Sequence, residues 1–221
     1  MRQSVSGMID VILKARFSYL FFTIILFFLL RTFIAGAVAI NLATNIFLWF
    51  IVIACVWAVH EKRRQQWFAM TMAAVAVATG LLDFLVPNAL TSWTSKITIV
   101  LFLGYAVVTI LIYLARQEEV TADMIMAGAS EYMLIGVLWA FLYMLVEAEY
   151  PGSFSFAGQK DRSGFIYYSF VTLTTTGYGD LLPVSDQARS LAILETITGQ
   201  LFIAITVARL VGLYTAKGNK N

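Results

Sequence analysis

The chain has 221 residues, a formal net charge of +2 and a composition that is 60% hydrophobic but only 13% charged. Its mean hydropathy is +0.81, and its charged fraction is well below the roughly 25% of soluble domains. The composition excludes an ordinary soluble domain and predicts an all-α integral membrane protein.

Six apolar segments, taken with their flanks, approach the roughly 20 residues that a helix needs to cross the bilayer. In chain order we expect these helices over Phe17–Val38, Phe47–Val59, Trp67–Val86, Ile97–Leu114, Met124–Val146 and Asp186–Tyr214. Polar residues at Asn41, Thr44 and Asn45 predict the break between the first two helices. Pro87 ends the third helix.

Basic residues predict the orientation of these six helices. They precede the first span, separate the second from the third, follow the fourth and end the chain: Arg2, Lys14, Arg16, Lys62, Arg63, Arg64, Arg116, Lys217 and Lys220. All four sites fall on one side of the membrane in a six-span arrangement. We therefore expect a multi-pass protein of the plasma membrane, with residues 1–16 and 216–221 in the cytoplasm and no cleavable signal peptide.

Residues 17–115 are expected to form a four-span domain, which a linker over 116–123 joins to a domain over 124–215. The fourth span, Ile97–Leu114, contains no charged residue. Cys55 is the only cysteine, so a disulfide within the chain and a thiolate zinc site are excluded. We expect Cys55 to serve packing and His60 to lie at the membrane interface.

The most informative motif is Thr172–Asp180, with the sequence TLTTTGYGD, between the last two apolar segments. Gly177 and Gly179 allow alternate residues to adopt backbone angles that a Cβ disfavours, so that successive carbonyls point the same way. With its two flanking spans, the motif resembles the selectivity filter of the tetrameric potassium channels. In that filter, four strands form rings of carbonyl oxygens that replace the water around K⁺.

The resemblance implies that K⁺ binds at Thr175, Thr176, Gly177 and Tyr178, where Thr175 contributes its hydroxyl and the others their carbonyls. Gly179 completes the filter. The family usually has Val or Ile where Thr176 stands, so this chain adds a hydroxyl behind the filter. Apart from K⁺ ions in the filter, no cofactor is expected. Neither catalysis nor nucleic-acid binding is indicated.

A short pore helix is expected from about Phe165 to Thr174, with Ser163 as its cap. The resemblance places the aromatic residues Tyr167 and Tyr168 around the filter, and Tyr168 could reach Asp180 as a strut. The alternative is that both tyrosines simply lie at the headgroup level of the bilayer.

The last span carries the candidate hinge and gate. Gly199 stands where the inner helix of similar channels bends, although glycine also serves close packing in membrane helices. Counting turns from Gly199 puts Ile203, Val207 and Val211 on one face, as an apolar pore lining that could gate by dewetting.

Glu131, Glu195 and Arg209 fall inside the last two spans, away from the outer end of the last one, where charge is costly. Glu131 and Arg209 lie at similar depth and are a candidate ion pair at the gate. Alternatively, Glu131 is protonated or faces water, and Arg209 extends to the headgroups. The sequence does not indicate a partner for Glu195.

The predicted function is that of a passive K⁺-selective channel. One chain supplies one filter strand, so three further copies are needed to form a homotetramer in the lipid bilayer. The layout also resembles the six-span voltage-gated channels, but without a charged fourth span, so steep voltage gating is not expected. A subunit of a K⁺ transporter and a non-conducting regulatory subunit are the alternatives.

Overall fold

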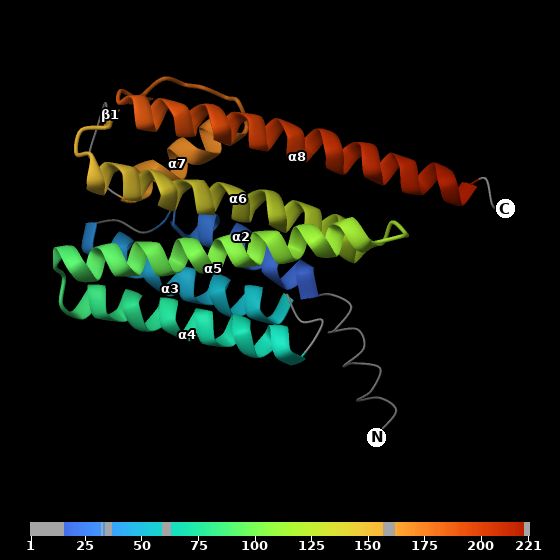
Figure 1. Cartoon of the computed structure of the whole chain (residues 1–221), viewed down its shortest axis with the longest axis horizontal. Helices are drawn as coiled ribbons and strands as arrows, with labels where there is room; N and C mark the ends of the chain where they lie inside the picture. Colours follow the sequence, from blue (N-terminus) through green and yellow to red (C-terminus); the bar gives the residue numbers. More distant parts are fainter. Residues whose placement is uncertain (1–15, 32, 34–36, 59–62, 157–161, 219–221) are drawn as a thin grey trace.

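The structure, a computed structural model, describes residues 16–31, 33, 37–58, 63–156 and 162–218. Its helices are α2 (Arg16–Arg31), α3 (Ala37–Ala58), α4 (Arg63–Leu85), α5 (Ala89–Arg116), α6 (Ala122–Glu149), α7 (Arg162–Leu173) and α8 (Asp186–Gly218). Two short strands, β1 (Phe154–Phe156) and β2 (Leu181–Pro183), complete the elements. The long helices lie alongside one another in an elongated bundle (Figure 1), and the predicted all-α membrane fold is confirmed.

Four helices among the described residues, α4, α5, α6 and α8, are long and apolar enough to cross a membrane. Helix α2 and the described apolar part of α3, Leu48–Ala58, are shorter. Large apolar side chains are nevertheless exposed along the bundle, among them Phe22 at 62% and Trp67 at 59%. Such a surface is suited to lipid or to other protein chains and not to water.

The boundary between the first two helices differs from the prediction. Helix α2 already ends at Arg31, and α3 runs from Ala37 through the polar residues of the expected break. Asn41, Thr44 and Asn45 therefore lie within a helix. Asn and Thr have only moderately low helix propensity, which does not by itself end a helix whose other residues are apolar and favour its continuation.

Helix α5 begins eight positions earlier than expected, at Ala89 instead of Ile97. Asn88 is its N-cap: the side chain accepts from the Thr91 amide at 2.9 Å, and the Thr91 hydroxyl accepts from the Asn88 amide at 3.0 Å. This reciprocal pair is a capping box. The longer helix includes Lys96, whose Nζ donates to Ser92 Oγ one turn earlier at 2.6 Å.

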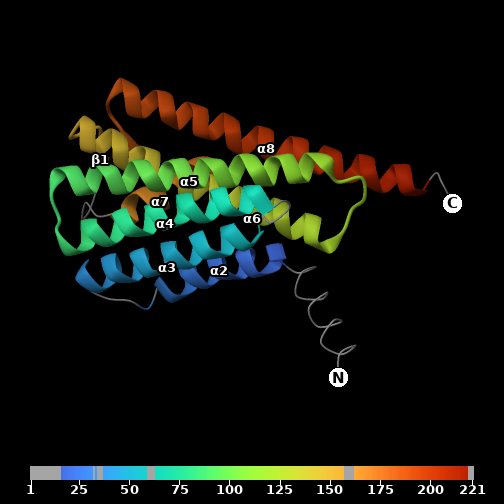
Figure 2. The same cartoon turned by 60° about the horizontal axis from the view of Figure 1, so that its bottom comes forward.

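Figures 1 and 2 show that the starts of α2 and α4, the α5–α6 loop and the end of α8 share one end of the bundle, whereas α7 and β1 lie at the other. The described basic residues at these helix ends, Arg16, Arg63, Arg64 and Arg116, are thus on the side opposite the predicted filter. This agrees with the sidedness expected from the sequence. Arg2, Lys14, His60, Lys62 and Lys220 lie outside the described residues, as does the Lys217 side chain.

The loop after α6 is fixed to the segment after the predicted filter. Strands β1 and β2 pair antiparallel, with Phe154 opposite Pro183. The Glu147 carboxylate accepts from the amides of Gly152 at 2.8 Å and Phe154 at 3.1 Å. These bonds hold the loop after α6 in place at the end of the molecule where α7 lies.

Candidate functional site

Helix α7, the predicted pore helix, lies between α6 and α8 (Figure 1), and a glycine on each of these two helices allows the close approach. A Cβ at Gly136 of α6 would come within 2.8 Å of the Phe170 ring. A Cβ at Gly199 of α8 would come within 2.5 Å of the Leu173 carbonyl oxygen. That carbonyl also accepts from the Tyr132 hydroxyl at 3.1 Å. The C-terminal end of α7, which leads directly into the filter segment, is therefore closely packed.

The helix begins at Arg162, so Ser163 falls in its first turn and is not the predicted cap. Helix α7 also packs against the N-terminal bundle, where Phe170 contacts Phe28 of α2 edge-on with ring centroids 5.0 Å apart.

The backbone of the filter segment alternates as the sequence predicted. Gly177 and Gly179 have φ of 60° and 79°, and Thr175 has φ of 58°. The two glycines adopt this left-handed conformation at no steric cost, whereas Thr175 is held there despite its Cβ. The Thr176 amide donates to the Val171 carbonyl at 2.9 Å, which fixes the start of the segment to α7.

Thr176, the residue that departs from the family pattern, has a hydrogen-bond partner. Its hydroxyl lies 2.8 Å from the Thr174 hydroxyl, which itself donates to the Phe170 carbonyl at 2.6 Å. A hydroxyl has one hydrogen to donate, so Thr176 donates to Thr174. The extra hydroxyl is thereby paired within the chain.

The tyrosine that faces the filter is Tyr167 and not Tyr168. The Tyr167 hydroxyl interacts with the Asp180 carboxylate, and its ring stacks on Tyr178 with centroids 6.4 Å apart and planes at 3°. The predicted Tyr168–Asp180 strut is wrong, because the two tyrosines are consecutive on a helix and point about 100° apart.

Tyr168 is buried on the other side of α7, at 5% exposure. Its ring packs edge-on against Tyr143 of α6 at 4.9 Å and against Phe154 of β1 at 5.4 Å. It therefore joins the pore helix to α6 and the outer loop. The proposed interfacial location does not hold for this residue either.

Helix α8 is capped by Ser185, whose Oγ accepts from the Ala188 amide at 3.2 Å. The helix continues without a break through Gly199 to Gly218. Gly199 thus serves close packing in this structure, and its role as a hinge remains a prediction. Ile203, Val207 and Val211 are exposed in the single chain, at 44%, 53% and 57%.

The predicted ion pair between Glu131 and Arg209 is wrong. Arg209 Nη2 donates to the carbonyl oxygens of Ala115 and Gln117, each at 2.7 Å. These carbonyls end α5, where the partial negative charge of the helix terminus favours a cation. Both carboxyl oxygens of Glu131 are buried and have no hydrogen-bond partner among the described residues.

Glu195, for which the sequence indicated no partner, contacts two hydroxyls. The Tyr143 hydroxyl lies against one carboxyl oxygen and the Ser169 hydroxyl against the other. Glu195 and Ser169 are each fully buried, and Tyr143 is as well. No periodicity or motif could have identified this cluster, because its members come from α8, α6 and α7.

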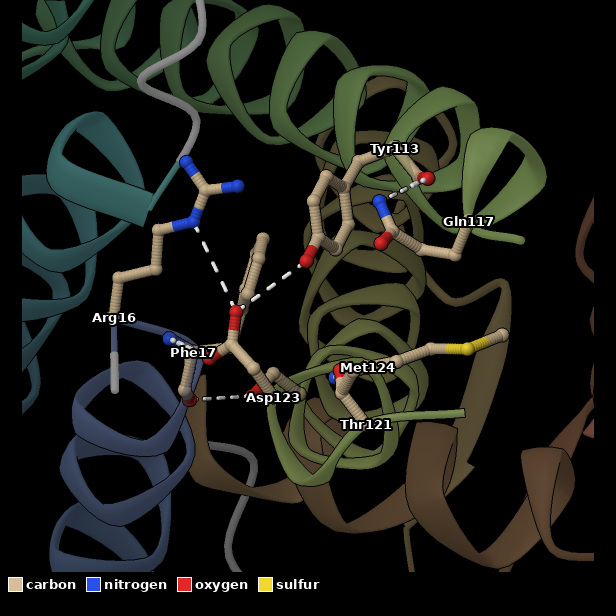
Figure 3. Close-up of polar contacts among 8 residues, drawn as sticks. Arg16, Phe17, Tyr113, Gln117, Thr121, Asp123 and Met124 are labelled. Atoms are coloured by element: carbon tan, nitrogen blue, oxygen red, sulfur yellow. Dashed lines mark hydrogen bonds and ion pairs between the residues drawn. The ribbon is translucent and has the colours of Figure 1, made fainter. Parts of the chain in front are cut away.

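A second cluster that the sequence analysis missed joins the bundle to the start of α6 (Figure 3). Asp123 Oδ2 lies 4.0 Å from Arg16 Nε and accepts from the Tyr113 hydroxyl at 3.3 Å. The Arg16 guanidinium also lies over the Tyr113 ring, 4.9 Å from its centroid. Asp123 had been assigned only to the linker, which in the structure is residues 117–121 between α5 and α6.

Comparison with known proteins finds similarity over the part of the chain that holds this site. Residues 129–216 match the family described as ion channel. Over 88 residues, the chain is 30% identical to the inward rectifier potassium channel Kirbac3.1 of Paramagnetospirillum magnetotacticum. The aligned region covers 38% of this chain and 27% of that channel. The chain therefore spans only about a quarter of that relative's length. No solved structure matches the chain.

The matched residues run from within α6 to the end of α8 and include the pore helix and the TLTTTGYGD segment. Over these residues the chain is similar to the ion channel family, and the relative that it matches there is a potassium channel.

Proposed function

We propose that the protein is a K⁺-selective channel that conducts passively. The observation that carries the proposal is the backbone of the filter segment, where φ is positive at Thr175, Gly177 and Gly179. This alternation lets carbonyl oxygens face a common axis, as dehydrated K⁺ requires. The ions would bind at Thr175, Thr176, Gly177 and Tyr178.

We further propose a homotetramer. Residues 174–180 are all exposed in the single chain, and one strand cannot surround an ion. Helix α8 is apolar but largely exposed, with Leu201 at 54% and Ile205 at 64%. Three further copies would cover part of this surface and complete the rings of carbonyls. Ile203, Val207 and Val211 would line the inner pore in that assembly.

The tetrameric arrangement also suggests roles for the two domains of the chain and an orientation in the membrane. Residues 17–115 would form a four-helix domain without gating charges, and residues 124–215 would form the pore. With the filter facing outward, the basic ends of the helices and both ends of the described chain would face the cytoplasm across the plasma membrane.

The test is single-channel recording from purified protein in lipid bilayers, with K⁺ and Na⁺ gradients applied in turn. We expect unitary currents whose reversal potential follows the K⁺ gradient. The control variant is Val75→Ala, at a 51% exposed position of α4, which should leave both readouts unchanged. Slow transport without unitary currents would favour a transporter subunit, and silence in every bilayer would favour a regulatory subunit.

The number of subunits is tested separately by the mass of the protein in native lipid particles. We expect four copies of the chain per particle. Any other number would contradict the four-fold cage, whatever the current measurements show.

A further inference from the structure

A buried carboxyl group connects three helices behind the filter. Glu195 lies on α8, its side chain is fully buried, and it contacts Ser169 of the pore helix and Tyr143 of α6. The Ser169 hydroxyl also lies 2.6 Å from the Gly136 carbonyl oxygen of α6. The contacts are complete within one chain and need no second subunit.

The hydrogens available in this cluster determine the protonation state of Glu195. A serine hydroxyl carries one hydrogen, and a backbone carbonyl can only accept. The contact between Ser169 and Gly136 therefore uses the serine hydrogen. Ser169 can then bond with the Glu195 carboxyl only as an acceptor, so Glu195 must supply a proton. Tyr143 donates its own hydrogen to the other carboxyl oxygen.

We propose that Glu195 is held as a neutral carboxylic acid and is a positioning residue for the filter. The chain of bonds runs from the Glu195 acid to the Ser169 hydroxyl and on to the Gly136 carbonyl. Each donor and acceptor is used once, which is the condition for burying polar groups without a large cost. The protonation state follows from the contacts alone, whereas the effect of Glu195 on K⁺ conduction rests on the proposed function.

The charges around Glu195 agree with a neutral acid. The ionisable side chains that interact with it are three tyrosines, Tyr132 and Tyr143 from α6 and Tyr168 from α7. Among the described residues, the polar contacts of Glu195 are with the hydroxyls of Tyr143 and Ser169 and not with a basic side chain. An ionised carboxylate buried without a counter-charge would be strongly unfavourable.

The cluster bears on the filter through the pore helix. Ser169 precedes Phe170 and Val171, whose carbonyls accept from Thr174 and Thr176 at the start of the filter. A displacement of α7 relative to α8 would therefore move these acceptors and the filter backbone with them. The neutral acid holds α7 at the separation that Gly199 and Gly136 allow.

The protonation state is tested by infrared difference spectroscopy of purified protein in lipid at neutral pH. Subtracting Glu195→Gln from the wild type should reveal the carbonyl band of a protonated carboxylic acid. The matched control is Glu149→Gln, which removes an exposed carboxyl group at the end of α6 and should reveal only carboxylate bands. If the Glu195 difference also contains only carboxylate bands, the proposal is overturned. This readout does not depend on conduction.

The positioning role is tested by reversal potentials in mixed K⁺ and Na⁺. Gln can donate to Ser169 and accept from Tyr143 as the acid does, so Glu195→Gln should keep the wild-type preference for K⁺. Glu195→Ala leaves both hydroxyls without their partner and should reduce that preference on the order of tenfold. If Gln and Ala reduce it equally, the positioning role is overturned. If the Ala variant does not assemble, Glu195 is needed for the fold, and loss of the K⁺ preference in Glu195→Gln overturns the positioning role.

A wild-type protein that shows the acid band but no K⁺ preference would contradict the proposed function and leave the neutral acid standing. A K⁺-selective wild type that lacks the acid band would do the reverse. The two proposals therefore fail in distinguishable ways.

Discussion

At the scale of single residues, the conformation of two glycines should decide selectivity. Replacing Gly177 or Gly179 by Ala places a Cβ on a residue with positive φ, which costs about 1–2 kcal/mol for an L-residue and favours rotation of a filter carbonyl. We expect either variant to lose the preference for K⁺ over Na⁺, measured from reversal potentials.

Gly152 provides the control for this experiment. It has φ of 88° and open space around its Cα, but it lies in the loop before β1. Gly152→Ala should introduce comparable backbone strain and leave selectivity unchanged. A filter-glycine variant whose reversal potential still follows the K⁺ gradient would refute the filter assignment.

Tyr167 should matter more for the filter than Tyr168. Tyr167→Phe removes the hydroxyl that interacts with Asp180, so the outer end of the filter should be less stable and single-channel openings shorter. Tyr168→Phe is the matched control, because its ring remains packed against Tyr143 and Phe154. Shorter openings in the Tyr168 variant alone would restore the strut that the sequence had suggested.

These residues also show how far sequence reasoning reached at this scale. The positive φ of Gly177 and Gly179 was predictable, because this conformation is local and glycine adopts it readily. Which tyrosine faces Asp180 depends on the rotation of α7 about its axis, which Gly136 and Gly199 set through packing. The two partners of Glu195 come from two other helices, α6 and α7, so only the tertiary structure could identify them.

At the scale of helices, the contact between α8 and α7 predicts the effect of a single methyl group. Gly199→Ala would place a Cβ within 2.5 Å of the Leu173 carbonyl oxygen, and overpacking of this kind costs about 1–3 kcal/mol. We expect a lower melting temperature of the assembled protein and a weaker K⁺ preference, since Leu173 directly precedes the filter segment.

Gly212 on the same helix has no neighbouring atom within 4 Å of an added Cβ. Gly212→Ala should therefore be neutral or slightly stabilising, because Ala is favoured over Gly in a helix by up to about 1 kcal/mol. Equal destabilisation by both substitutions would argue against the close contact with Leu173.

The contacts of Arg209 predict that substitutions at Arg209 and at Glu131 act independently. In a double-mutant cycle of Glu131→Gln and Arg209→Gln, the effects on melting temperature and open probability should add, because the side chains share no bond. Arg209→Gln alone should weaken the attachment of α8 to the end of α5 by about 1.5–3 kcal/mol, the usual contribution of a hydrogen bond to a charged group. A coupling energy above about 1 kcal/mol in the cycle would restore the ion pair.

Helix ends were predictable where the sequence marks them by charge or proline. Helices α4, α6 and α8 begin and end within about four residues of their expected bounds, as is usual for such predictions. The break after α2 carries no such mark, and the polar residues within α3 misled the assignment. The capping box of Asn88 and Thr91 was the signal that would have placed the start of α5 correctly.

At the scale of the whole molecule, the placement of the basic helix ends Arg16, Arg63, Arg64 and Arg116 at one end of the bundle followed from counting spans and basic residues. The manner in which the first four helices meet the pore half did not follow. Arg16, Tyr113 and Asp123 meet across three helices (Figure 3), and Arg209 reaches the end of α5. Such contacts depend on the rotation and relative height of packed helices, which hydropathy does not specify.

These contacts attach the N-terminal helices to α6 and α8, but the fourth span itself offers little charge to move. From Ile97 to Ala115, α5 has no charged residue, and Lys96 before this stretch is bonded to Ser92 on the same helix. Each elementary charge that crosses the field contributes only about 2.3 kcal/mol per 100 mV, so steep opening needs several. We expect conductance to change only gradually with voltage in planar bilayers. A sigmoidal curve equivalent to several charges per channel would contradict this and would require mobile charge outside α5.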